Sequence, residues 1–217
     1  MGAVWGTAGL NLALVGSVVL GTMYSLPPIR LKRFPLLAAL CIVVVRGTLI
    51  NVGFFAHAQA AVFSGSASAL SSSYADVLHT FLNDPKCMLS SLFYGVFGIV
   101  IALMKDVPDV TGDSIANIKS FSVRIGQTKI FRNSRRLLSL LLFGFGGGFL
   151  FHAIKGAPSS TTAACRAVVG CTSVFAGLEV RRKAVDVNPE DSEEVFSYYM
   201  YLWKIFYLSY LALPFAR

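Results

Sequence analysis

Residues 92–113 read LFYGVFGIVIALMKDVPDVTGD, an uncharged apolar run that ends in one lysine and three aspartates. The apolar part, from Leu92 to Met104, predicts a helix inside a membrane. Pro108 and Gly112 are expected to stop this helix from continuing. A bent loop then carries three carboxylates: Asp106, Asp109 and Asp113. Charge at the end of a membrane helix is costly, so the pattern favours a functional role for these side chains.

Clustered aspartates at a membrane face are typical of a site for a hard divalent cation. Mg²⁺ takes oxygen ligands and keeps phosphate oxygens in its coordination shell. The loop therefore predicts a magnesium-bound diphosphate on a lipid substrate, with all three aspartates as metal ligands and catalytic residues. The alternative, from the same residues, is a solvated acidic loop without a ligand.

The composition excludes an ordinary water-soluble domain. Of the 217 residues, 55% are hydrophobic and 14% are charged, and the mean hydropathy is +0.65. One soluble core cannot bury that much apolar surface. We expect a single all-α domain, residues 1–217, built as a polytopic transmembrane bundle of about six helices. Their expected ranges are 4–24, 35–59, 88–104, 137–154, 162–178 and 195–215.

The basic residues gather on one side of this predicted bundle. The net charge is +8, and the connections after the first, third and fifth expected helices carry 13 of the 19 lysines and arginines. This asymmetry places those connections, and the aspartates with them, on the cytosolic, stromal or matrix face. A membrane explains the charge pattern, so no nucleic-acid partner is predicted.

Four polar residues in the second expected helix and in the connection before it are candidates for binding the substrate. The connection after the first helix offers Tyr24, Arg30 and Lys32, although the same residues are equally typical of an interfacial anchor. Arg46 lies about 16 Å into the second helix, at 1.5 Å per residue. A guanidinium at that depth needs other helices, a polar cavity or a carboxylate around it.

Two further stretches predict short helices at the membrane surface. Residues 115–127 alternate apolar and polar side chains, and Lys119 and Arg124 in this segment are candidates to face the phosphate site. Residues 76–85 also form a short amphipathic piece, to which no chemistry is assigned. The last expected helix is aromatic on every face, which suits either a wall along an isoprenoid chain or ordinary packing.

Five short stretches, in order along the chain, carry a family resemblance. They are YSLPPIRLKRF at 24–34, VRG at 45–47, KDVPDVTGD at 105–113, KSFSVRIG at 119–126 and YMYLWKIFY at 199–207. Together they resemble the UbiA superfamily of intramembrane prenyltransferases, and most of all its plastid homogentisate phytyl- and solanesyltransferases. The likeness runs nearly from end to end, which makes it more specific than any one motif.

The resemblance implies a fold, a chemistry and a set of residues. In that family, nine transmembrane helices surround a cavity in which two aspartate-rich motifs hold Mg²⁺ on an isoprenoid diphosphate while an aromatic acceptor is alkylated. Asp109 and Asp113 match the second motif, Asp106 accompanies it in the homogentisate branch, and Lys119 matches the basic residue after it. Residues 24–34 match the loop that lines the phosphate end.

The resemblance therefore implies a Mg²⁺-dependent transferase of the plastid envelope or thylakoid membrane. It would move a polyprenyl or phytyl group from its diphosphate to homogentisate or a similar aromatic acceptor, toward tocopherol or plastoquinone. The family's first motif, Asn-x-x-x-Asp-x-x-x-Asp, and its first three helices are missing from this sequence. That difference leaves a second expectation open: an inactive prenyltransferase-like subunit of a larger plastid complex, which holds lipid, quinone or pigment beside other membrane subunits.

Overall fold

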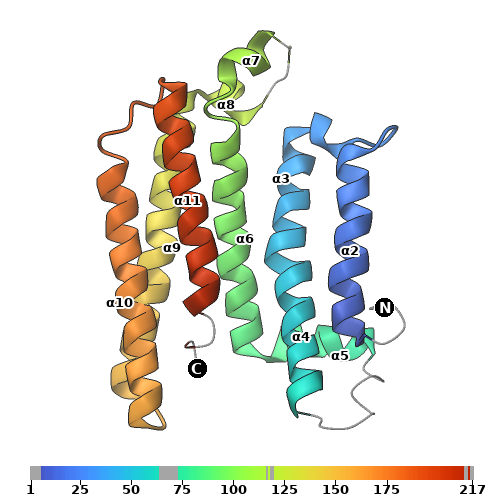
Figure 1. The fold of residues 1–217 in the computed structure, drawn as a ribbon, viewed down its shortest axis with the longest axis vertical. Helices are drawn as coiled ribbons and strands as arrows, with labels where there is room; N and C mark the ends of the chain where they lie inside the picture. Colours follow the sequence, from blue (N-terminus) through green and yellow to red (C-terminus); the bar gives the residue numbers. More distant parts are fainter. Residues whose placement is uncertain (1–5, 64–72, 116, 118–119, 213–214, 216–217) are drawn as a thin grey trace. The chain divides into compact units, whose positions relative to one another are not determined.

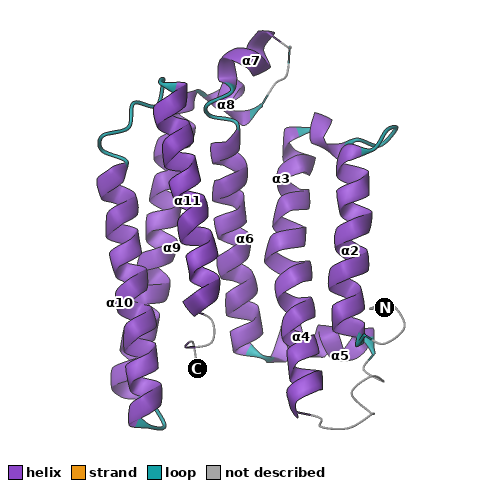
Figure 2. Ribbon diagram, viewed as in Figure 1, coloured by secondary structure: helices purple, strands orange, loops and turns teal. Residues whose placement is uncertain are grey.

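The structure is a computed structural model that describes residues 6–63, 73–115, 117, 120–212 and 215. Its regular structure is helical throughout, and no strand occurs among these residues (Figures 1 and 2). The all-α class is therefore confirmed. The helices group into two compact units, Met1–Ile99 and Val100–Arg217, and the helix α6 (Pro85–Lys105) runs through the division between them.

The first unit contains two long antiparallel helical segments. One is α2 (Ala8–Ser25), and the other runs without a break through α3 (Pro35–Val43), the π-helical turn η2 (Val44–Leu49) and α4 (Ile50–Phe63). A 3-10 turn, η1 (Leu31–Arg33), lies in the connection between the two segments. The second segment begins at Pro35, as expected, because proline is tolerated in the first turn of a helix.

Glycines set the closest helix approaches in the first unit. A Cβ added to Gly9 would lie 2.5 Å from the carbonyl oxygen of Gly53, and one added to Gly47 would lie 2.6 Å from the Cα of Gly95. Both obstacles are backbone atoms, which cannot move aside. These helices therefore pack with their backbones almost in contact, as small residues allow between membrane helices.

The second unit holds the end of α6 and five further helices. Two short ones, α7 (Val110–Ile115) and α8 (Phe121–Ile125), follow α6, and three long ones come after them. The long helices are α9 (Gln127–Lys155), α10 (Ser160–Lys183) and α11 (Ser192–Ala212). Helices α9 and α10 form a hairpin that packs closely where a Cβ on Gly146 would lie 2.9 Å from the carbonyl oxygen of Gly170.

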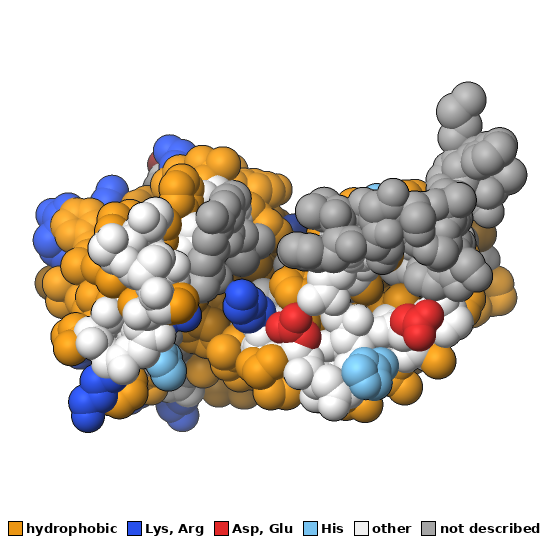
Figure 3. Space-filling model, turned by 90° about the horizontal axis from the view of Figure 1, so that it is seen from below, with side chains coloured by type: hydrophobic (Ala, Val, Ile, Leu, Met, Phe, Trp, Pro, Cys, Tyr) orange, Lys and Arg blue, Asp and Glu red, His pale blue; other side chains and the backbone are white. Residues whose placement is uncertain are grey.

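Five helical segments are long and apolar enough to cross a membrane. They are Ala8–Ser25, Pro35–Ala60, Pro85–Lys105, Gln127–Lys155 and Ser160–Lys183. Large hydrophobic side chains are exposed in both units, and some of them are seen on the face drawn in Figure 3. These segments match five of the six expected spans. The sixth, α11, is long enough, but its many tyrosines lower its hydropathy.

Several expected helix limits are corrected by the structure. Tyr24 lies in the last turn of α2 and not in the loop after it. Gly112 lies inside α7, so the prediction that it interrupts helical structure is wrong, whereas α6 does end at Lys105. Helix α9 begins at Gln127, ten residues before the expected range, because its basic first turns are helical outside the apolar run. The short amphipathic piece at 76–85 is confirmed as α5 (Tyr74–Asn83).

Candidate active site

Residues 106–113, which we call the aspartate connection, begin with a tight turn at the end of α6. The backbone N–H of Val107 donates to the carbonyl oxygen of Met104 at 3.3 Å, and both side chains are fully buried. Asp106 lies between these two apolar anchors, so its side chain is only 26% exposed. Lys105 lies beside it, with Nζ 3.9 Å from Oδ1 of Asp106. Packing thus holds one carboxylate at the boundary of the core.

Burial and like charge act together on Asp106. Desolvation raises the pKa of its carboxyl group, and the charges of Asp113 and Asp109 raise it further. Lys105 lowers this pKa, but its effect is smaller than that of burial. The ionised form of Asp106 is therefore destabilised as the site stands, and a cation bound nearby would favour it.

The other two aspartates flank the first turn of α7. The backbone N–H of Asp113 donates to the carbonyl oxygen of Asp109 at 2.8 Å. Asp109 is exposed and Asp113 is half-buried. A Cβ added to Gly112 would lie 3.1 Å from Oδ1 of Asp109, so glycine at this position leaves room for the carboxylate.

Two residues from later in the chain fix the backbone of this connection. The side-chain amide of Gln127, at the start of α9, donates to the carbonyl oxygen of Val107 at 3.0 Å. The hydroxyl of Ser192, at the start of α11, donates to the carbonyl oxygen of Pro108 at 2.8 Å. Adjacent carbonyls are therefore held by two different helices. Sequence reasoning missed both residues, because a contact across 84 positions leaves no local pattern.

The expected cations of the second unit lie in the segment after α7. Arg124 is exposed in the last turn of α8, a helix that contacts α7. Lys119 lies outside the described residues. Ser120 and Ser122, which flank the start of α8, are buried, and neither hydroxyl has a hydrogen-bond partner among the described residues.

The remaining four candidates belong to the first unit. Tyr24 is half-buried at the end of α2, and Lys32 is exposed in η1. Arg30 precedes η1 with a φ of 38°, a left-handed conformation, and its carbonyl oxygen accepts from the N–H of Arg33 at 3.0 Å. Arg46 is half-buried within the π-helical turn η2. The structure thus places the three aspartates on one connection and distributes these four residues over α2, η1 and η2.

The π-helical turn has its own hydrogen-bond support. The side-chain amide of Asn51 donates to the carbonyl oxygen of Arg46, and it also lies 3.4 Å from the carbonyl oxygen of Gly47. A π-helical turn shifts the hydrogen-bond register within a helix and frequently marks a functional site. Asn51 therefore supports the local backbone that carries Arg46.

The aromatic residues of α11 divide into two groups. Tyr198 and Phe206 are buried, and the hydroxyl of Tyr198 donates to the carbonyl oxygen of Val180 at 2.9 Å, which makes them part of the core. Tyr207 is 60% exposed and stacks on Trp203 with ring centroids 5.4 Å apart. Tyr198 and Phe206 therefore serve ordinary packing, whereas Trp203 and Tyr207 offer an aromatic surface.

The aspartates supply the ligand type that Mg²⁺ prefers, since a carboxylate oxygen is a hard donor. Within the described part of the chain, no three His, Cys, Asp or Glu side chains converge closely enough to hold one ion. The donor chemistry of Asp106, Asp109 and Asp113 therefore fits a cation that takes its other ligands from phosphate oxygens and water.

The comparisons with known proteins identify one family. The model of the UbiA prenyltransferase family matches residues 1–210. Homogentisate phytyltransferase 1, chloroplastic, from Arabidopsis thaliana is 34% identical over the whole chain, and homogentisate phytyltransferase from Synechocystis sp. is 39% identical over 98% of it. Homogentisate geranylgeranyltransferase from Hordeum vulgare is 35% identical over 98%. The chain spans 50%, 62% and 47% of these relatives, respectively. No solved structure gives a significant match.

Proposed function

Because the chain belongs to the UbiA prenyltransferase family, we propose that it transfers a prenyl group from an isoprenoid diphosphate to homogentisate. The relatives' names support this acceptor, since all three are homogentisate prenyltransferases. They differ in donor, phytyl or geranylgeranyl, so the proposal names the class of donor and not its chain length. Chloroplastic relatives support a plastid membrane as the location.

The observation that carries this proposal is the aspartate connection at the end of α6. Asp106 is kept near the core by the buried side chains around it, and burial raises the pKa of its carboxyl group even though Lys105 lies beside it, with Asp113 and Asp109 raising this pKa further. A structural loop gains nothing from such an arrangement, because burying a carboxylate beside two others costs stability. A site that binds a cation together with a diphosphate does benefit from three neighbouring carboxylates, because their charges attract the cation.

Under this proposal, Asp106, Asp109 and Asp113 offer carboxylate oxygens to Mg²⁺ that arrives with the diphosphate and takes its other ligands from phosphate oxygens and water; when bound, Mg²⁺ would neutralise charge on the departing diphosphate. The residues of the chain then have distinct tasks. Arg124 and Lys119 bind phosphate oxygens through charge-assisted hydrogen bonds. Tyr24, Arg30, Lys32 and Arg46 are further proposed substrate-binding residues. Gln127 and Ser192 do not touch the substrate, and they position the aspartates through the backbone.

The proposal is tested by product formation with matched acidic variants. The purified protein in liposomes would be given homogentisate, Mg²⁺ and phytyl or geranylgeranyl diphosphate, and prenylated homogentisate would be measured by mass spectrometry. Asp109→Ala and Asp113→Ala should each lower the rate about 100-fold or more, the usual effect of removing a group that stabilises developing charge. Asp186→Ala, an exposed acidic residue after α10, is the control.

Two results would overturn the proposal. One is an unchanged rate in Asp109→Ala and Asp113→Ala while both variants insert normally into the membrane. The other is the absence of product from the wild-type protein with either donor, which would favour the inactive structural subunit instead. In that case the protein should copurify with other membrane subunits.

A further inference from the structure

The short helix α5 exposes an apolar strip that the proposed chemistry does not use. Val77 and Phe81 face inward and pack in the hydrophobic cluster of the first unit. Tyr74, Leu78 and Leu82 are spaced four residues apart and are 62%, 58% and 64% exposed. Residues with this spacing share one face of a helix. We call Tyr74, Leu78 and Leu82 the α5 strip.

The packing of α5 places it at a membrane surface. Its inward face contacts Ala8, the first residue of α2, and Cys87, in the first turn of α6. Both helices are candidate spans, so α5 crosses the level at which two spans begin, and it runs across them and not alongside (Figure 1). With ten residues it is too short to span the bilayer itself. An amphipathic helix at this level lies in the interface with its apolar side chains among the acyl chains.

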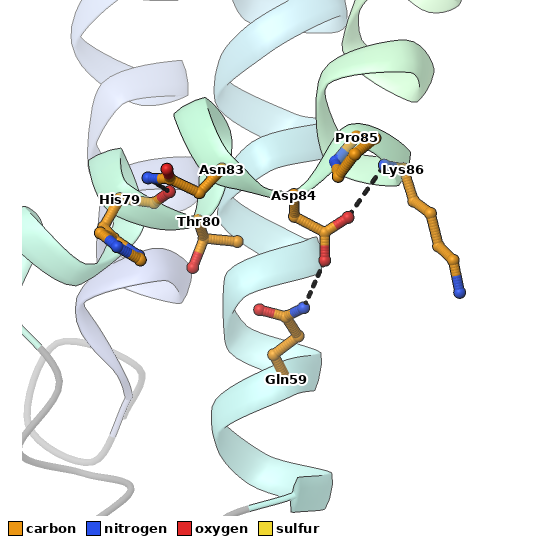
Figure 4. A pocket seen from close by; sticks show the side chains of 7 residues that line it. All are labelled: Gln59, His79, Thr80, Asn83, Asp84, Pro85 and Lys86. Carbon is orange, nitrogen blue, oxygen red and sulfur yellow. Dashed lines mark hydrogen bonds between the residues drawn. The ribbon is translucent and has the colours of Figure 1, made fainter.

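A pocket lined mostly by polar residues lies beside the strip, at the end of α5. It has a volume of about 500 Å³. Helix α5 contributes His79, Thr80 and Asn83, α4 contributes Gln59, and the α5–α6 joint contributes Asp84 and Lys86 (Figure 4). His79 and Asn83 each follow a strip residue directly in sequence, so the polar pocket and the apolar strip occupy neighbouring surfaces of one helix.

The carboxylate of Asp84 accepts three hydrogen bonds in this pocket. Its Oδ1 accepts from the backbone N–H groups of Lys86 at 2.9 Å and Cys87 at 3.3 Å, which caps the start of α6. Its Oδ2 accepts from the side-chain amide of Gln59 at 2.9 Å (Figure 4). The amide of Gln59 is used as a donor in this bond, which presents its Oε1 as an acceptor. The pocket therefore offers a preorganised set of polar atoms.

The charges and group types of the pocket select among lipid headgroups. Asp84 and Lys86 balance each other when His79 is neutral, so an anionic phosphate headgroup gains little and meets the carboxylate. A quaternary ammonium headgroup prefers the faces of Trp, Tyr or Phe rings, and none of these residues is among the described residues that line the pocket. Hydroxyl groups both donate and accept, which suits a mixture of carboxylate, amide, imidazole and ammonium groups. An uncharged headgroup rich in hydroxyls is the best match.

We propose that the α5 strip and its pocket bind an uncharged membrane lipid with a sugar headgroup. The headgroup occupies the pocket between α5 and the start of α6, and the acyl chains lie along Tyr74, Leu78 and Leu82. The lipid acts as a ligand of the first unit, and its site does not depend on the prenyl-transfer proposal.

Lipid retention measured by native mass spectrometry tests this assignment. The purified protein in detergent would be incubated with equal amounts of a monogalactosyl diacylglycerol, a phosphatidylglycerol and a phosphatidylcholine with identical acyl chains. The galactolipid should be retained preferentially. His79→Leu, in the pocket, and Leu78→Gln, on the strip, should each reduce its retention about five- to tenfold, the usual effect of one hydrogen bond or of one exposed apolar contact.

The controls separate the two halves of the proposed site. His152→Leu, a histidine near the end of α9, should leave retention unchanged. Leu78→Gln changes an exposed residue and keeps the fold, so it remains informative even if His79→Leu unfolds. Water-soluble galactosylglycerol should bind more weakly than the lipid and should be insensitive to Leu78→Gln.

Three outcomes would overturn the proposal. Equal retention of the three lipids, or preference for phosphatidylglycerol, would remove the sugar-headgroup assignment. Full retention by Leu78→Gln would mean that a protein segment and not a lipid covers the strip. Binding of free galactosylglycerol as tightly as the galactolipid would show that the acyl chains play no part.

Discussion

Replacing Gln127 with leucine should lower catalytic efficiency without unfolding the protein. The Gln127 amide donates to the carbonyl oxygen of Val107, whose side chain is fully buried beside Asp106. Leucine has a similar size but cannot donate, so the carbonyl loses its partner. Leaving such a group unsatisfied costs about 1–3 kcal/mol, which corresponds to a change of about 5- to 150-fold in an equilibrium or rate constant. The lost hydrogen bond destabilises the backbone of the aspartate connection.

We expect kcat/KM for the isoprenoid diphosphate to fall about tenfold or more, within the range set by that lost hydrogen bond. Because Gln127 acts through the backbone of the metal-binding connection, a higher Mg²⁺ concentration should be needed for half-maximal rate. The KM for homogentisate should not change. Ser192→Ala should produce a smaller effect of the same kind, since its hydroxyl holds the adjacent carbonyl of Pro108.

The assay is steady-state formation of prenylated homogentisate at varied diphosphate and varied Mg²⁺. Asn133→Leu is the matched control, because it also removes an amide from α9 but at an exposed position. The double variant Gln127→Leu/Ser192→Ala should lose less than the sum of the two single effects, as expected for residues that hold one element. If Gln127→Leu keeps the kcat/KM and the Mg²⁺ dependence of Asn133→Leu, the positioning role is wrong.

Three other predictions concern stability and local geometry. Asp106→Asn should raise the melting temperature at neutral pH. Because the pKa of Asp106 is raised in the folded protein, its carboxyl group costs no stability below the unfolded pKa of 3.8, and stability is lost as the pH rises through the folded pKa. A difference in melting temperature between variant and wild type that does not shrink toward low pH would contradict this. Gly146→Ala should destabilise the α9–α10 hairpin by about 1–3 kcal/mol, because its Cβ would meet backbone atoms of α10. Gly147→Ala, which faces open space, should stabilise it by about 0.5–1 kcal/mol, so denaturant unfolding that shifts equally in both variants would refute the packing argument. Asn51→Leu should lower stability by about 1 kcal/mol and reduce prenyl transfer through Arg46, and an active, equally stable variant would show that the π-helical turn needs no such support.

The sequence predicted features that depend on composition and on single residues with strong local effects. The apolar runs predicted five of the membrane-spanning helices, and Pro35 correctly marked the start of one of them. Lys105 marked the end of α6, because a charged residue is expected where the membrane ends. The family resemblance, based on motifs at the aspartate connection and in α11, is confirmed by the comparisons.

Other features depend on contacts that no local pattern contains. The expected range of the fourth span begins at residue 137, yet α9 begins at Gln127, because arginine and lysine have helix propensities close to that of leucine and continue the helix beyond the apolar run. The π-helical turn around Arg46 has no signal in the sequence. The hydrogen bonds of Gln127 and Ser192 to the aspartate connection join residues 20 and 84 positions apart, and they required the folded structure.

Calorimetric titration with a non-reactive isoprenoid thiolodiphosphate tests the central claim most directly. The claim is that Asp109 and Asp113, together with Asp106, bind the diphosphate through Mg²⁺. The wild-type protein should bind the analogue in the presence of Mg²⁺ and lose binding when EDTA is added. Asp109→Ala and Asp113→Ala should abolish the Mg²⁺-dependent part, and Asp186→Ala should retain it. Equal affinity in all four proteins, with and without Mg²⁺, would contradict the account.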